Sequence, residues 1–374
     1  MTKWAEVDLA ALRDNTAALR DHVGPGCAVM AMVKANGYGH GAVHAASAAL
    51  AGGATWLGVS SINEALELRR AGVSARILNI GWTMPEEMAA ATADSIDIAV
   101  FDPAAVAAAG DAASHAGTPM RVHWKIDTGM GRLGTRLADV DAMRDALLAA
   151  SGDVSVVALF THFAVADEAS TDFTLEQHDR FLAAVAGVRS SFPDALLHAA
   201  NSAALLRLPQ THHDIVRPGI ALYGYAPVHC AGIVTLRTAL TVRALITQVK
   251  DIDVSESVGY GREWVAPRRA RVAVVAAGYA DGVDRRNGGR GEVIAGGARC
   301  PIIGRVSMDQ LSIDVTDVAG VSCGDPVTLL GESGGHTVDA AAIGDAIGTI
   351  PNEVLCAVSS RVPRVPVTHL EETG

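Results

Sequence analysis

Short apolar segments alternate with longer alanine-rich segments up to about residue 225. In the longer segments apolar residues recur on one helical face, as Leu9, Leu12 and Leu19 do, and this spacing predicts helices. The short segments are almost continuously apolar, which is typical of strands buried on both faces of a parallel sheet. We expect strands over residues 27–34, 56–60, 76–80, 97–101, 120–127, 154–162, 196–201 and 214–224.

This number of strands favours a closed sheet. Eight βα units close a parallel barrel, so the pattern predicts an α/β fold with a (β/α)8 TIM-type barrel over residues 1–228. An open doubly wound sheet uses similar units and is the alternative. Its dinucleotide-binding version is disfavoured, because no G-x-G-x-x-G pattern follows the first strand.

The pattern changes from about residue 229. Segments rich in Val, Ile and Thr, separated by Gly and Pro turns, predict a mainly β C-terminal domain over residues 229–374. Within it, residues 287–297 indicate paired hairpin turns, and residues 339–348 indicate one inserted helix. A chain of 374 residues agrees with two domains.

Composition argues against several classes of protein. Apolar residues make up 49% of the chain, and a formal net charge of -11 argues against nucleic acid or an anionic membrane as partner. The five cysteines are scattered without a C-x-x-C pair, which indicates reduced thiols rather than disulfides or a zinc site, and we expect no metal. The N-terminus lacks an apolar signal region, and no segment approaches the ~20 apolar residues of a membrane span. We therefore expect a cytoplasmic protein.

Polar residues stand at the ends of the predicted strands, where barrel enzymes carry their chemistry. Five of these ends carry Lys34; Lys125 and Asp127; His162; Asn201 and Ser202; and Arg217, Pro218 and Gly219. A strand that simply reaches the surface explains one such end, but five converging ends favour a site. Ser202 follows the seventh strand and Gly219 lies in the eighth, and barrels often bind phosphate at the loops after these two strands; Tyr38 adds a hydroxyl near Lys34.

Lys34 ends a buried apolar run, in the sequence MVKANGYGHG. A lysine is rarely buried without a partner, and a desolvated amine with a lowered pKa is a nucleophile or base. A reactive lysine that faces a phosphate site fits pyridoxal phosphate, with the amine forming a Schiff base. A lysine aldolase on the same barrel shares both features, so the residues alone predict a Schiff-base barrel enzyme.

Eight motifs together resemble the alanine racemase family, in order and over residues 7–364. They are MVKANGYGHG, KIDTGMGRLG, THFAVADE, NSAA, VRPGIALYG, VGYGREW, GYADGV and GRVSMDQ. The resemblance implies a cytoplasmic homodimer, with pyridoxal 5'-phosphate as cofactor and sites between subunits. It also implies that a first strand at about residues 3–8 packs with the second domain. The implied reaction is isomerisation of L-alanine and D-alanine, which supplies D-alanine for peptidoglycan.

The resemblance also implies roles for individual residues. Lys34 would carry the cofactor as an aldimine, Tyr260 of the other subunit would be the second base, and Lys125 matches a position that is often carbamylated. The remaining cofactor-binding residues would be Tyr38, Arg132, His162, Asn201, Ser202, Arg217, Gly219 and Ile220. The substrate-binding residues would be Arg132, Tyr279, Met308, Asp309 and Asn352.

Racemisation explains these residue types. A Cα proton must leave one face and return to the other, so two bases, Lys34 and Tyr260, flank the substrate. Arg217 at the pyridine nitrogen disfavours ring protonation and so limits side reactions. A decarboxylase of the same barrel type would use a carboxylate there, and a carrier protein would lack the β domain that holds Tyr260.

Two positions depart from the family pattern. Ser307 stands where many members have cysteine, and we expect a mild effect. Asn352 stands in TIPNEV where the family usually has tyrosine, which opens space beside the substrate. The alternative function is therefore a serine or broader-specificity amino-acid racemase of the same family.

Overall fold

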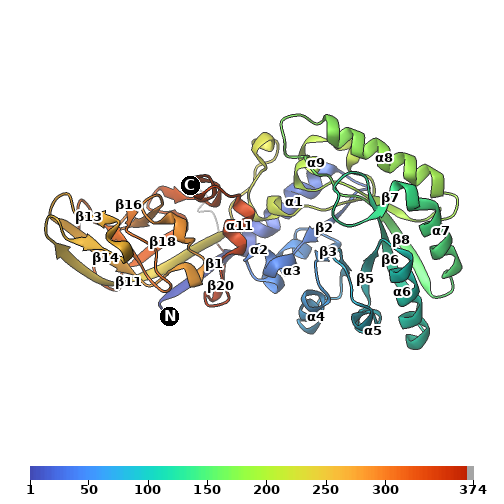
Figure 1. Ribbon diagram of the computed structural model, residues 1–374, viewed down its shortest axis with the longest axis horizontal. Coiled ribbons are helices and arrows are strands. Elements are labelled where there is room, and N and C mark those ends of the chain that lie inside the picture. Colours follow the sequence, from blue (N-terminus) through green and yellow to red (C-terminus); the bar gives the residue numbers. More distant parts are fainter. Residues whose placement is uncertain (369–374) are drawn as a thin grey trace. The chain divides into compact units, whose positions relative to one another are not determined.

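The computed structural model describes residues 1–368 (Figure 1). The chain divides into two compact units, and the N-terminal segment belongs with the C-terminal one. One unit comprises residues 11–37 and 42–237; the other comprises residues 1–10, 38–41 and 238–374, of which the structure describes those up to 368.

The first unit is an almost closed parallel barrel, as the sequence predicts. Its sheet runs in the order β10-β2-β3-β4-β5-β6-β8-β9, and all of its strand pairs are parallel. The strands are β2 Ala28–Met32, β3 Trp56–Val59, β4 Arg76–Asn79, β5 Ile96–Val100, β6 Met120–Asp127, β8 Val154–Phe160, β9 Leu196–His198 and β10 Ile215–Val216. The two ends of this order are bridged by backbone hydrogen bonds from Asp214 to Leu197 (3.1 Å) and from Arg217 to Ala200 (2.9 Å).

Helices connect the strands and surround them (Figure 1). They are α1 Leu9–Val23, α3 Ala42–Ala51, α4 Ile62–Arg70, α5 Pro85–Ala93, α6 Pro103–Ala116, α7 Val140–Ala149, α8 Asp172–Val188 and the short α9 Ser202–Arg207. Local sequence fixes their starts: the Ser61 and Asp102 side chains accept hydrogen bonds from the N–H groups of Glu64 and Ala105. A short strand, β7 Thr135–Arg136, pairs with β6.

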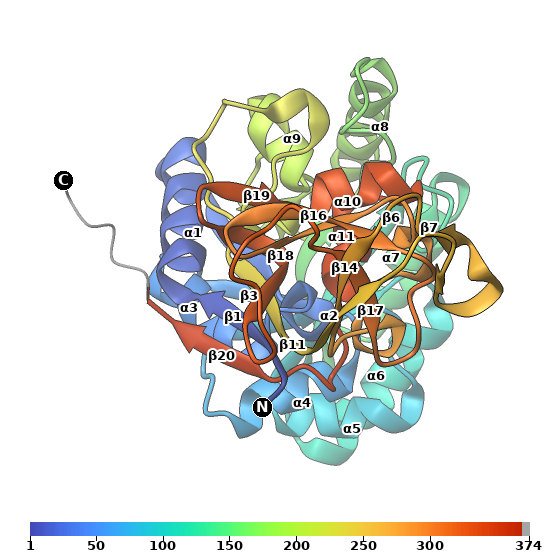
Figure 2. The same cartoon turned by 90° about the vertical axis from the view of Figure 1, so that its left-hand side faces the viewer.

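The second unit is built on a mainly antiparallel sheet (Figure 2). Its order is β19-β18-β15-β16-β17-β14-β11-β1-β20. The strands are β1 Lys3–Asp8, β11 Leu240–Ile252, β14 Ala270–Val275, β15 Glu292–Ala295, β16 Ala298–Ile303, β17 Leu311–Asp314, β18 Pro326–Ser333, β19 His336–Val338 and β20 Arg364–Val367. The first strand of the chain, β1, lies between β11 and β20, which ties the N-terminus into this sheet.

Three segments differ from, or add to, the local structure that the sequence predicts. The predicted eighth strand, 214–224, is wrong in length, because β10 stops at Val216 before Pro218 and the chain turns into a 3-10 helix, η3 Ile220–Tyr223. Residues 339–348 do form a helix, α10 Ala340–Ile347, but a second helix follows, α11 Pro351–Cys356, which the periodicity of so short a segment could not indicate. A hairpin joins β15 to β16 through Gly296 and Gly297, both at positive φ.

Within residues 1–368 no helix combines the length and the apolarity needed to cross a membrane.

Candidate active site

Lys34 stands two residues beyond β2, where the backbone turns sharply. It begins α2 Lys34–Tyr38, in which Ala35, Asn36 and Gly37 have left-handed φ values of 52°, 53° and 60°. A left-handed backbone is unfavourable for alanine, and such strain is often found at functional sites. Side chains hold the turn: the Glu64 carboxylate accepts from the Ala35 N–H at 2.7 Å, and the Asn36 side chain accepts from the Ala42 N–H at 2.9 Å.

Basic side chains surround Lys125 at this end of the barrel. Lys125, on β6, is 5% exposed. Burial, and then the charges of Arg217, Arg132 and Lys34, lower its pKa from 10.5 to about 8. Burial and the same cations, together with Lys125, hold the pKa of His162 well below its usual value. Asp127 is the negative charge near Lys125. Because the basic side chains outnumber this carboxylate, the cluster favours binding of an anion.

Arg217 follows β10 and is buried, with four polar partners. Its Nη1 contacts His198 Nδ1 at 2.7 Å, and its Nη2 donates to the carbonyls of Thr161 (2.7 Å) and Ala199 (2.9 Å) and contacts His162 Nδ1 at 3.2 Å. None of these partners, which lie within residues 1–368, carries a negative charge. Burial lowers the pKa of Arg217 to about 9. These hydrogen bonds leave Nε–H unused, so this donor can face another group.

Ser202 and Gly219 come together as predicted. The buried Ser202 hydroxyl accepts from the N–H groups of Gly219 (2.9 Å) and Ala221 (3.3 Å), at the start of η3, which begins at Ile220. Its own O–H therefore remains a donor. Asn201 caps α9, since its side chain accepts from the Ala204 N–H at 3.0 Å. The Ser202 O–H is thus a donor held in place at this end of the barrel.

Arg132 lies exposed on the loop after β6. The Asp127 carboxylate orders this loop by accepting from the N–H groups of Gly129 (3.0 Å) and Gly131 (3.0 Å and 3.1 Å). Gly131 has a φ of 69°, a conformation that glycine adopts without strain. The ordered loop keeps the Arg132 charge close enough to Lys125 to lower its pKa.

The other predicted residues belong to the β unit. Tyr260 is 72% exposed, in the 3-10 helix η5 Tyr260–Arg262, and the neighbouring Glu263 forms an ion pair with Arg305. Met308 is 52% and Tyr279 43% exposed. Their loops are joined, because the Tyr279 N–H donates to the Ser307 carbonyl at 3.0 Å.

Tyr38, Asp309 and Asn352 also lie in the β unit. Tyr38 is buried, and burial, with a smaller effect of Cys356, raises the pKa of its hydroxyl to about 12. The Asp309 carboxylate accepts from Arg361 Nη2 at 2.6 Å. Asn352 is half-buried near the start of α11.

The predicted residues therefore form two groups. One, in the barrel, contains Lys34, Lys125, Arg132, His162, Asn201, Ser202, Arg217, Gly219 and Ile220; the other, in the β unit, contains Tyr38, Tyr260, Tyr279, Met308, Asp309 and Asn352. Sequence reasoning missed His198, the closest side-chain partner of Arg217. The only signal was a histidine at the end of an apolar strand, which is usually a core residue.

Comparisons with known proteins place the chain in a family. The family model for the N-terminal domain of alanine racemase matches residues 7–227, and that for its C-terminal domain matches residues 239–366. An alanine racemase of Symbiobacterium thermophilum is 42% identical over 363 residues, 96% of each chain. Among solved structures, an alanine racemase of Streptomyces lavendulae is 38% identical, with a TM-score of 0.93. The match covers 99% of this chain and 98% of the Streptomyces chain. An alanine racemase of Bartonella henselae, solved with covalently bound pyridoxal phosphate, is 27% identical, with a TM-score of 0.87. This match covers 98% of this chain and 100% of the Bartonella chain. The chain belongs to the alanine racemase family.

Proposed function

We propose that the protein is a pyridoxal phosphate-dependent alanine racemase, an isomerase that interconverts L-alanine and D-alanine. The observation that carries this proposal is the cationic cluster around the buried Lys125, which includes Lys34, at the end of a barrel whose family consists of alanine racemases. The serine or broader-specificity alternative depends on Asn352 alone, and the comparisons favour alanine.

The residues of the barrel fit the cofactor. A phosphorylated aldehyde needs a primary amine and donors for a dianionic phosphate, and this end of the barrel offers an amine, three further basic side chains and the O–H of Ser202. Lys34 would hold the aldehyde carbon, and Tyr38, Ser202, Gly219 and Ile220 the phosphate. Asn201 would support this end through the cap of α9.

Arg217 would direct its unused Nε–H at the pyridine nitrogen. When bound, the cofactor disperses the negative charge left on Cα after proton removal. Because arginine gives up its proton far less readily than a carboxylic acid, Arg217 leaves that nitrogen unprotonated and moderates the charge dispersal. His162, which contacts Arg217 Nη2 through Nδ1, would connect Arg217 with Tyr260.

Two bases would move the Cα proton. Lys34 removes or returns it on one face of the substrate, and the Tyr260 phenol does so on the other. Arg132 would bind the substrate carboxylate, together with Met308 and Asp309, while Tyr279 and Asn352 line the pocket. The proton can then leave from one side and return to the other, which inverts Cα.

Lys125 would be carbamylated. A neutral amine attacks CO2, and a pKa of about 8 leaves a sizeable neutral fraction near physiological pH. The resulting anion would be stabilised by Arg132 and Arg217, which disfavour the lysine cation. It would then orient Arg132 toward the substrate.

We further propose a cytoplasmic homodimer in which Tyr260, Met308 and Asp309 of each subunit complete the site of the other. Two observations support it: Tyr260 and Met308 are large and exposed, and they lie in a different unit from Lys34. We place the domain boundary near residue 228, with β1 counted with the C-terminal domain.

The direct test uses purified protein loaded with pyridoxal phosphate. Incubation with L-alanine should yield D-alanine, detected by D-amino acid oxidase, until the two enantiomers are equal. Retention of L-alanine by fully loaded protein would refute the proposal.

A further inference from the structure

A chain of buried polar side chains leads from Arg217 through the barrel interior to Asp97. His198 closes β9 and contacts Arg217 Nη1 through Nδ1 at 2.7 Å. Its Nε2 contacts His123 Nδ1 on β6 at 2.9 Å, and His123 Nε2 contacts Asp97 Oδ2 on β5 at 3.4 Å. Asp97, His123 and His198 are all 0% exposed. We call Arg217, His198, His123 and Asp97 the relay.

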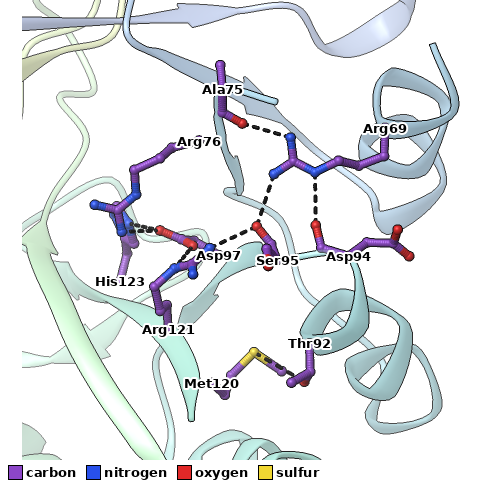
Figure 3. A network of polar contacts seen from close by, with 10 residues as sticks. All are labelled: Arg69, Ala75, Arg76, Thr92, Asp94, Ser95, Asp97, Met120, Arg121 and His123. Atoms are coloured by element: carbon purple, nitrogen blue, oxygen red, sulfur yellow. Dashed lines mark hydrogen bonds and ion pairs between the residues drawn. The ribbon is translucent and has the colours of Figure 1, made fainter. Parts of the chain in front are cut away.

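Asp97, the last residue of the relay, is paired with two arginines (Figure 3). Arg121 Nε donates to Asp97 Oδ1 at 2.6 Å, and Arg76 Nη2 donates to Oδ2 at 2.9 Å. Both arginines stand at or near the first residue of their strands, whereas Arg217 follows the last residue of β10. Because the strands are parallel, the relay connects the two ends of the barrel.

Chemistry permits one arrangement of protons along the relay. A guanidinium only donates, so His198 Nδ1 must accept, and its Nε2–H then donates to His123 Nδ1. His123 is left with Nε2–H, which donates to the Asp97 carboxylate. Burial opposes a charge on Asp97, but the hydrogen bond from His123 and the charges of Arg76 and Arg121 hold its pKa below the usual value. Burial lowers the pKa of both histidines, so both rings are neutral.

Aromatic contacts hold the two rings in this orientation. Phe160 stacks on His198, with centroids 4.6 Å apart and planes 12° apart. Trp56 meets His123 edge-on at 5.3 Å, and the Arg76 guanidinium lies 3.9 Å from the Trp56 ring centroid. The rings therefore have little freedom to rotate and exchange donors for acceptors.

We propose that Asp97 and His123 are positioning residues for Arg217. The Asp97 carboxylate fixes the tautomers of His123 and His198, so that a lone pair always faces Arg217 Nη1, and it supplies the nearest negative charge along this hydrogen-bonded path. Arg217 is thereby held in one orientation, with its Nε–H free for the cofactor. The proposal rests on the proposed function only for the role of Arg217, because the tautomers are a property of the chain itself.

The test uses protein with 15N-labelled histidine and two-bond 1H–15N correlation NMR, with His198→Gln and His123→Gln to assign the rings. Wild-type protein should show Nε2–H tautomers for both. In Asp97→Asn, where the amide can donate or accept, the nitrogen resonances of His198 should shift although His198 does not touch Asp97. Asp94→Asn, which alters an exposed carboxylate outside the relay, should leave them unchanged.

Kinetics of the loaded enzyme gives the second readout. Asp97→Asn and His123→Gln should lower kcat about 10- to 100-fold and change KM for alanine much less, because the relay acts through Arg217 and not on the substrate. His123→Gln keeps the pairs of Asp97 with Arg76 and Arg121, so it reports on the relay even if Asp97→Asn folds poorly.

Unshifted His198 resonances in a folded Asp97→Asn or His123→Gln variant, or an Nδ1–H tautomer in the wild type, would overturn the proposal. Predicted tautomers in a protein that does not racemise alanine would instead refute the proposed function and leave the relay standing.

Discussion

The barrel and the β unit present their candidate site residues in different ways. In the barrel, Lys125 and Arg217 are buried, and each hydrogen bond of Arg217 has a defined partner within the unit. In the β unit, Tyr260, Met308 and Tyr279 expose between 43% and 72% of their surfaces. The buried barrel residues have fixed partners and favour binding of an anion, whereas the three exposed side chains of the β unit offer a surface for a further contact.

This difference agrees with a division of the proposed activity between the two units. In the proposed function, the barrel would hold the cofactor and one base, and its residues would depend on buried charge and fixed hydrogen bonds. The β unit would supply the second base and the substrate-facing residues, which would act once another subunit covers them. Substitutions in the two units should therefore lower the racemisation activity in distinguishable ways.

The largest effect should come from Lys34→Ala, since it removes both the covalent anchor and one base. We expect racemisation to fall by more than about 1,000-fold. Borohydride reduction of the wild type followed by peptide mapping should place the cofactor on Lys34. The other lysines, Lys3, Lys125 and Lys250, are internal controls, and label on any of them would contradict the assignment.

Tyr260→Ala should slow one direction of proton transfer more than the other. Tyr260 is proposed to act on the L-face and Lys34 on the D-face, so exchange of the Cα proton in deuterated water should slow by about 100-fold or more for L-alanine and much less for D-alanine. Mass spectrometry of each enantiomer at short times gives the two rates. Equal slowing would show that one base serves both faces.

Lys125 should give a smaller, pH-dependent effect. With a pKa of about 8, half of its amine is neutral at pH 8 and about 1% at pH 6, against an ordinary lysine pKa of 10.5. Carbamate formation should therefore rise with pH through this range, visible as a 13C carbonyl signal after addition of 13C-bicarbonate. Lys125→Arg keeps a cation but cannot form a carbamate, so it should lack the signal and lose about 10-fold in kcat/KM. An equal signal in this variant would place the carbamate elsewhere.

The smallest effect should come from Asn352→Tyr. A pocket change of this size shifts preference by about 1–3 kcal/mol, so alanine should remain a good substrate in both proteins. We expect wild-type protein to racemise serine measurably and the variant to do so less. Ratios of kcat/KM for serine and alanine measure this, and an unchanged ratio would mean that Asn352 does not set specificity.

The short apolar segments predicted the parallel strands of the barrel, and the Val-, Ile- and Thr-rich segments predicted the mainly β domain. The strand pattern alone did not decide between a closed barrel and an open doubly wound sheet, because both use the same βα units. The sequence placed Lys34 and Ser202 at strand ends because the βα rhythm makes those ends visible. It overextended the strand at 214–224, since an apolar run does not reveal where Pro218 and Gly219 turn the backbone into η3.

The relay could not be predicted from the sequence. Asp97, His123 and His198 lie on three different strands, and whether such residues meet inside a barrel depends on strand register. The exposure of Tyr260 could not be predicted either, because a tyrosine between two glycines can be an exposed turn residue or a packed one.

The central claim is that the barrel of one subunit and the β unit of another form each site. Mixing two inactive proteins, Lys34→Ala and Tyr260→Phe, tests it most directly. After subunit exchange, confirmed by differently tagged chains in one dimer, each hybrid has one site with both substitutions and one with neither. The account predicts recovery of up to about a quarter of wild-type activity at equal mixing, because half of the dimers are hybrids and each has one intact site. No recovery despite proven exchange would contradict the account and place both bases of each site within a single chain.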